Sequence, residues 1–359
     1  PQNLVVILHA YGRLNVRDVE LLKSISQQLL KAPDKLEGKY ITMVCNSFGR
    51  LGVRGPLWQE LSQRIRERVD WLAPVDLALI AHGFGKVAIR EKEFLAGPFS
   101  DATVASIAGF TPKQLACLLD GLTLAGCLRE DLFFATMEEY IRQGSIGGRQ
   151  RQHMMSRVLF TVMLERKHLL EGVSPAWQPL LSRVHHAPID APPRPYHREL
   201  ATCATALSLK ARPRRRKGPY IVDLHVPVEA HVPAGSFPAN QFTVSGLAVH
   251  LMAEAEFCPI TGELLGPTRL RRRHLLQMQW QHLGLRRKDW LALPDTEARV
   301  TELESLLVER VPLRRRPVAI LEVEGNTTST PQIENSEQLS TPWSNEKDAL
   351  VVAKPGANM

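Results

Sequence analysis

The stretch SFGRLGVR at residues 47–54 decides the fold of the first part of the chain, because it recurs there. The earlier copy is AYGRLNVR at residues 10–17, and the later one is GFGKVAIR at residues 83–90. A looser fourth copy, GLTLAGC, begins at residue 121. The copies start at residues 10, 47, 83 and 121, so the steps are 37, 36 and 38 residues. Such steps are typical of helical hairpin repeats.

Each repeat unit has the apolar spacing of two helices. In unit two, the first helix carries Tyr40, Ile41, Val44, Phe48 and Leu51, and the second carries Trp58, Leu61, Ile65 and Val69. We expect the first helix to end near the repeated glycine, as a C-terminal cap would require. Thr111 followed by Pro112 predicts another helix start. Residues 1–144 are therefore predicted to form an α-solenoid of helical hairpins, whose concave face binds a partner. Because the sequence opens inside the first predicted helix, we expect the natural chain to begin earlier.

One apparent cofactor motif falls within the repeat. Gly83, Gly85 and Ala88 follow an apolar run and have the spacing of a dinucleotide-binding loop. The positions equivalent to Gly83 in the first two units are Ala10 and Ser47, which make no such loop. The glycines are therefore interpreted as a repeat feature, and no cofactor is predicted.

Residues 145–217 are predicted to be a helical connector. Apolar spacing indicates helices over residues 151–171, 174–184 and 197–210. Residues 187–196 are rich in proline, so they are predicted to be an extended linker.

Charge is distributed unevenly along the chain, which has 45 Lys+Arg, 37 Asp+Glu and a net charge of +8 over 359 residues. Residues 1–144 carry 17 basic and 16 acidic side chains, residues 145–320 carry 26 and 15, and residues 321–359 carry 2 and 6. Only the middle block is strongly basic. The polar, acidic last block lacks a core-forming pattern, so we expect residues 311–359 to be an extended tail. Five widely spaced cysteines indicate a reducing compartment.

Four clusters hold a third of all the basic side chains, and no acidic residue lies inside any of them. The absence of acidic neighbours predicts clusters that are not neutralised internally and that bind a polyanion. The clusters are Arg212, Arg214, Arg215, Arg216 and Lys217; Arg269, Arg271, Arg272 and Arg273; Arg286, Arg287 and Lys288; and Arg314, Arg315 and Arg316.

The pattern changes to strands after residue 217. YIVDLHV at residues 220–226 and LAVHLM at residues 247–252 alternate as strands do. The segment TRLRRRHLLQMQW at residues 268–280 is predicted to be a helix, and HLGL at residues 282–285 another strand. This order over residues 218–310 resembles the RAP domain, which lies behind helical repeats in organellar RNA-associated proteins. The units before it resemble the heptatricopeptide or octotricopeptide repeats of such proteins.

The resemblance implies an α+β chain in which an α-solenoid precedes a restriction-endonuclease-like α/β domain. Nucleases of that fold hold a divalent metal between two acidic residues on neighbouring strands. Asp223 matches the first acidic residue, but the second strand offers His250 and Met252 where the family has a carboxylate and an Asp-Gly turn. The protein is therefore predicted not to be an enzyme.

A zinc site is the other metal alternative. His225, His231, His250 and Cys258 could form a set, but their spacing fits no standard pattern. No metal is predicted. Trp280 and Trp290 are interpreted as core residues rather than as bases for RNA stacking.

The arginines of residues 269–273 have two interpretations. Arg271, Arg272 and Arg273 cover most of a helix circumference, so some could pair with Asp223 or Glu256. Bidentate phosphate binding is the favoured alternative, because guanidinium suits phosphate.

The sequence thus predicts a non-catalytic RNA-binding component of a mitochondrial ribosome that clamps rRNA phosphates. Its predicted partners are RNA and other ribonucleoprotein subunits, with no membrane contact. A factor that processes or stabilises organellar transcripts is the alternative, and a nuclease or a protein-only adaptor is less favoured.

Overall fold

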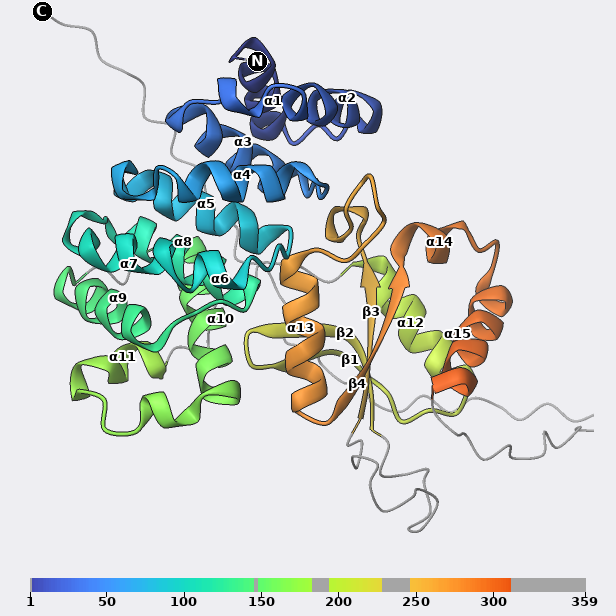
Figure 1. Cartoon of the computed structure of the whole chain (residues 1–359). Helices are drawn as coiled ribbons and strands as arrows, with labels where there is room; N and C mark the ends of the chain where they lie inside the picture. The colour runs from blue at the N-terminus through green and yellow to red at the C-terminus, as the bar shows by residue number, and fades with distance from the viewer. Residues whose placement is uncertain (1, 145–147, 183–193, 228–245, 311–359) are drawn as a thin grey trace, which may run out of the picture. The chain divides into compact units, whose positions relative to one another are not determined.

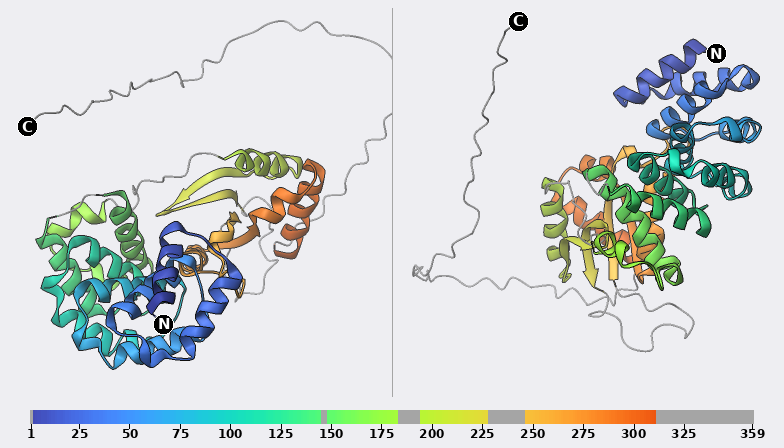
Figure 2. Two further views of the ribbon diagram at one scale, coloured as in Figure 1. Left: turned by 90° about the horizontal axis from the view of Figure 1, so that it is seen from above. Right: turned by 90° about the vertical axis from the view of Figure 1, so that its left-hand side faces the viewer.

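Paired helices fill the first half of the chain in the computed structural model, which describes residues 2–144, 148–182, 194–227 and 246–310 (Figure 1). The helices of this half are α1 (Gln2–Leu14), α2 (Val19–Leu30), α3 (Gly38–Leu51), α4 (Leu57–Arg66), α5 (Pro74–Lys86), α6 (Lys92–Leu95), α7 (Pro98–Ala105), α8 (Pro112–Ala125), α9 (Glu130–Arg142), α10 (Arg149–Glu165) and α11 (Gln178–Leu181). The first helices of successive units, α1, α3, α5, α8 and α10, pack side by side in chain order. The blue-to-green ribbons of Figure 2 show the same order from two further directions. The repeated aromatic positions Phe48 and Phe84 are buried between these helices.

The repeated glycine has a role that differs from the predicted one. Gly49 lies inside α3, and the helix continues to Leu51 before Gly52 caps it in the left-handed conformation at φ 72°. A methyl group added at Gly49 would lie 2.6 Å from the Cα of Gly83 on α5, and one added at Gly83 would lie 2.5 Å from the carbonyl oxygen of Cys45. The helix ends near the repeated glycine, as expected, but its cap is Gly52, and Gly49 has another role. It allows the backbones of neighbouring helices to approach closely.

The helix start at Thr111 is confirmed. Its hydroxyl accepts a hydrogen bond from the backbone N–H of Gln114, and the Gln114 side chain accepts one from the N–H of Thr111. Gly83 and Gly85, which have the spacing of a dinucleotide loop, lie within α5 rather than between a strand and a helix.

The connector differs from the prediction in its lengths. Helix α10 ends at Glu165 and is followed by a 3-10 turn at Lys167–Leu170, so the predicted helix over residues 151–171 is interrupted. The predicted helix over residues 174–184 is reduced to the 3-10 turn Pro175–Trp177 and the short α11. Helix α12 (Pro195–Ala206) begins at Pro195, because proline suits the first turn of a helix. The rest of the predicted linker up to residue 193 lies outside the described residues.

A four-stranded sheet follows, in the order β1-β2-β3-β4 (Figure 1). Its strands are β1 (Arg212–Lys217), β2 (Tyr220–Pro227), β3 (Gly246–Met252) and β4 (Trp280–Arg286). The β1–β2 and β2–β3 pairs are antiparallel, and β4 runs parallel to β3 after the crossover helix α13 (Gly266–Gln277). The predicted strands are confirmed. The predicted helix is confirmed up to Gln277, but Trp280, which was placed in it, begins β4. Strand β1 was not predicted. Its arginines are compatible with a strand because it lies at the sheet edge.

Helices cover both faces of the sheet. On one face, α12, α14 (Arg287–Ala292) and α15 (Thr296–Arg310) contribute to a core with β2, β3 and β4. On the other face, Leu275 of α13 packs with Val222, Ala248 and Trp280. Trp280 and Trp290 are both buried, as predicted. The chain is therefore mostly helical with a small mixed sheet, which confirms the α+β class.

Candidate nucleic-acid interface

The first arginine cluster forms the edge strand β1. Arg212, Arg215 and Lys217 are exposed there, and the Lys217 ammonium lies 5.5 Å from the centre of the Trp280 ring. The guanidinium of Arg216 donates to the Gly218 carbonyl. Within the described ranges, no carboxylate forms an ion pair with Arg212 or Arg215. This edge therefore presents cations that remain available to a ligand.

The second cluster, on α13, is largely paired. Arg271 lies 2.6 Å from Glu256, and Arg273 lies 2.7 Å from Glu165 at the end of α10. Arg269 donates to the Leu264 carbonyl at 2.8 Å. No acidic residue lies inside this cluster, as noted in the sequence, but folding brings carboxylates to two of its arginines from distant parts of the chain. The pairing of an α13 arginine with Glu256, one of the two interpretations, is confirmed.

Arg272 is the exception in the α13 cluster. Its side chain is exposed, and no described carboxylate pairs with it. It is thus the member of this helix that can contact a polyanion.

The third cluster lies at the junction of β4 and α14. The Arg286 guanidinium stacks over Phe257 at 4.0 Å from the ring centre, and Glu254 lies 3.5 Å from Arg286 and 3.7 Å from Lys288. Arg287 donates to the Leu251 carbonyl at 3.1 Å. The fourth cluster, Arg314, Arg315 and Arg316, lies outside the described residues.

Asp223 is buried on β2 and its carboxylate is surrounded by donors. It accepts hydrogen bonds from His197 Nε2 at 2.9 Å and from the Leu251 N–H at 2.7 Å, and His250 Nδ1 lies 2.8 Å away. Burial by itself raises the pKa of Asp223, but His250, the Leu251 N–H and His197 outweigh it and lower the pKa. The arginine pairing considered for Asp223 is therefore wrong, since histidines occupy its oxygens.

Glu256 is the centre of a second polar group, next to Asp223. Its oxygens lie 3.2 Å from His250 Nε2 and 2.6 Å from Arg271, and they accept hydrogen bonds from the Thr268 hydroxyl and the Ala253 N–H. His250 thus sits between the carboxylates of Asp223 and Glu256. No group of three or more His, Cys, Asp or Glu side chains among the described residues is arranged to hold a metal ion.

The four candidate zinc ligands are used for other contacts where they are described. The His225 ring stacks on Trp280 with centres 4.2 Å apart. The Cys258 sulfur accepts from the backbone N–H groups of Arg54 and Thr261, each at 3.4 Å. His231 lies outside the described residues.

A polar column that the sequence analysis missed crosses the repeat helices. Its members occupy the position just before the repeated motif and recur at steps of 37, 36, 38 and 37 residues: His9, Asn46, His82, Asp120 and Arg157. Arg157 donates two hydrogen bonds to Asp120, at 2.7 and 2.6 Å, and both side chains are buried. His82 Nε2 lies 3.8 Å from Asp120. The repeat period was the signal that could have revealed this column.

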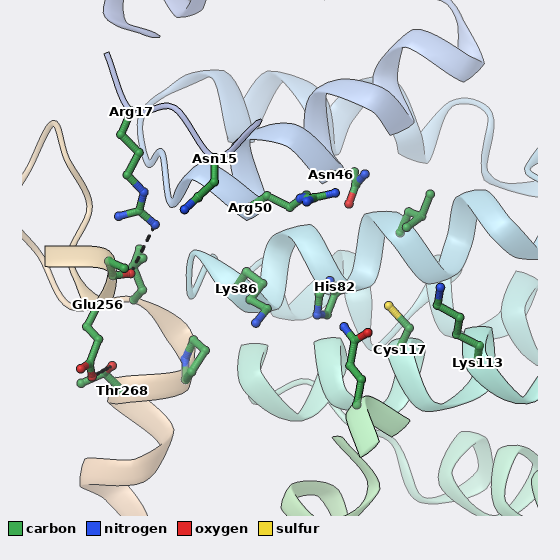
Figure 3. Close-up of a pocket in the computed structure, with 16 residues that line it drawn as sticks. Asn15, Arg17, Asn46, Arg50, His82, Lys86, Lys113, Cys117, Glu256 and Thr268 are labelled. Atoms are coloured by element: carbon green, nitrogen blue, oxygen red, sulfur yellow. Dashed lines mark hydrogen bonds between the residues drawn. The ribbon is translucent and has the colours of Figure 1, made fainter. Parts of the chain in front are cut away.

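A cavity of about 570 Å³ lies beside this column. The first helices supply its cations, Arg50 from α3, Lys86 from α5 and Lys113 from α8, and the α13 end of the sheet domain forms another wall (Figure 3). Arg17 also lines it and donates to the Ala255 carbonyl at 3.3 Å. Burial lowers the pKa of His82 to about 4, helped by the Lys86 charge, so this ring is neutral at pH 7.

No family model matches the chain, and no curated protein matches it significantly. Among the residues that the structure describes, no helix combines the length and apolar character needed to cross a membrane.

Proposed function

We propose that the protein binds RNA through its phosphates without cleaving it, as a structural component of a mitochondrial ribosome. In this proposal the helical hairpins are a short α-solenoid of the heptatricopeptide or octotricopeptide type, and residues 218–310 form a RAP-type domain. The observation that carries the RNA part is the exposed edge strand β1, on which Arg212 and Arg215 have no described carboxylate partner.

Contacts to the backbone rather than to bases suit this surface. Guanidinium groups on an extended strand can pair bidentately with successive phosphates. Trp280 and Trp290 are buried, so they do not offer rings on which bases could stack. Binding of this kind depends on salt and is tolerant of sequence.

The side chains that a nuclease would use support a non-catalytic role. Asp223 and Glu256 are both occupied by histidine, arginine and backbone donors. A carboxylate in such a setting has no oxygen facing a substrate, so the phosphate contacts are proposed to position RNA only.

The test compares two arginine variants by RNA affinity across a salt series. In the double variant Arg212→Ala/Arg215→Ala, the slope of log Kd against log salt should decrease by about 1.4, at about 0.7 per lost phosphate contact on a single strand. Arg271→Ala serves as the matched control, because its cation already pairs with Glu256. An unchanged slope in the double variant would remove the claim that β1 binds phosphate.

The assembly is tested separately by sedimentation of the native protein. Co-migration with a mitochondrial ribosomal subunit at high salt is expected. Migration apart from ribosomes but with transcripts would replace the ribosomal role with that of a transcript-processing or stabilising factor.

A further inference from the structure

Three cations line the cavity, one from each of three successive repeat helices. Figure 3 shows Arg50 from α3 and Lys86 from α5, with Lys113 from α8 on the far side of Cys117 from Lys86. Arg50 and Lys86 occupy equivalent positions in the repeat, since each directly follows the glycine at position 49 or 85. In the part of the chain that the structure describes, no carboxylate pairs with any of the three.

The carboxylates nearest to the cavity are already engaged. Asp120 is held by two hydrogen bonds from Arg157, and Glu256, which lines the cavity, is held by Arg271 and Thr268. Burial lowers the pKa of Lys86, and the charge of Arg157 lowers it further. Asp120 raises the pKa of Lys86 in part, and a bound anion would act in the same sense, because its negative charge favours the protonated ammonium.

The other walls can hold the remainder of a larger ligand. Asn15, Asn46 and Gln150 offer amide groups, while Leu79 and Pro267 offer apolar surface. A volume of about 570 Å³ exceeds that of a phosphate ion and lies within the range of small-molecule sites.

The first turn of α13 adds to the positive potential. Leu265 and Thr268 from this turn line the cavity, and no side chain caps the N-terminus of the helix. A helix N-terminus favours negative charge, so it acts in the same sense as the three cations.

We propose that this cavity binds one nucleotide through its phosphate, with Arg50 and Lys86 as the phosphate ligands and Lys113 as a cation toward the other end of the cavity. The nucleotide is either free or the phosphorylated end of an RNA chain. The site is separate from β1 and involves none of the residues assigned to RNA binding there, so it stands whether or not that proposal holds.

Calorimetric titration of the full chain with AMP, with inorganic phosphate and with a 5′-phosphorylated RNA decamer tests the site. We expect AMP or the decamer to bind, and Lys86→Met and Arg50→Gln/Lys113→Gln each to weaken that binding at least tenfold. Arg13→Gln is the matched control, since Arg13 occupies the equivalent repeat position but does not line the cavity. The Arg212→Ala/Arg215→Ala variant should bind AMP as the wild type does, which separates this site from β1.

The probes also distinguish the sources of the nucleotide. Binding of AMP that the decamer cannot displace indicates a free nucleotide. Preference for the 5′-phosphorylated decamer over AMP and over its 5′-hydroxyl form indicates an RNA end. The proposal is overturned if neither AMP nor the decamer binds, if inorganic phosphate binds as tightly as they do, or if the two cavity variants retain wild-type affinity.

Discussion

The arginines of α13 and the cations of the repeat cavity have different partners in the fold. Arg271 and Arg273 each lie within 2.7 Å of a glutamate oxygen. Arg50 and Lys86 face a cavity in which the described carboxylates are already taken. A paired cation holds the structure together, whereas an unpaired one in a cavity is available to a ligand. The arginine run of α13 is therefore not the best place to look for a bound anion.

The largest expected effect concerns Asp120 and Arg157, the buried ion pair beside the cavity. In Asp120→Ala, Arg157 would remain buried without a counter-charge, so the free energy of unfolding should fall by about 3–5 kcal/mol. Urea unfolding measures this difference. Asp101→Ala is the control, since Asp101 is exposed where it pairs with Arg129, and it should lower stability by less than about 1 kcal/mol. Equal effects for the two variants would contradict the distinction between structural and available charges.

The helices and strands were predicted from the sequence better than the contacts between them. The strands at residues 220–226 and 247–252, the helix α13 and the hairpin units follow from local periodicity, which acts within a few residues. Strand β1 was missed because five basic residues and a proline have no strand periodicity, and only pairing with β2 makes them a strand. The repeated glycines were found, but their role depends on the neighbouring helix.

The candidate site was predictable only in part. The sequence identified which residues are basic, but Glu165 lies 108 residues from Arg273, and no local rule predicts that they meet. The column from His9 to Arg157 could have been read from the repeat period. The cavity itself could not, because its walls come from the repeats and from α13.

The next largest effect concerns Glu256, the carboxylate that pairs with Arg271, and how its contribution to stability depends on pH. Burial alone raises the pKa of Glu256, but His250 and Arg271 outweigh it and hold the pKa well below its ordinary value. A lowered pKa in the folded state stabilises the protein above the unfolded value of about 4.3, and this stabilisation is lost as pH falls below it. Glu256→Gln should therefore lower the free energy of unfolding by about 1.5–3 kcal/mol at pH 7. The difference from wild type should shrink when urea unfolding is repeated at pH 4 and pH 3.

The control for that series is a glutamate outside the network. Glu20 is exposed and pairs with Lys23 over one helical turn, so Glu20→Gln should change stability by less than about 0.5 kcal/mol. A Glu256→Gln difference that stays constant from pH 7 to pH 3 would show that the Glu256 charge does not stabilise the fold.

The smallest expected effect is a gain in stability, and it concerns Lys86, one of the cations that line the cavity. Lys86 is partly buried beside Arg157 with no described carboxylate partner, so its charge is unfavourable in the ligand-free fold. Lys86→Met keeps the length of the side chain and removes the charge, and it should raise the free energy of unfolding by about 0.5–1 kcal/mol. Lys113→Met, at an exposed position on the same cavity, should leave stability nearly unchanged in the same urea series. Residues that bind ligands are often retained at a cost in stability, so a gain for Lys86→Met together with weaker nucleotide binding would indicate that Lys86 is kept for its ligand. A loss of stability would instead place Lys86 with the paired arginines of α13, as a cation that the fold itself requires.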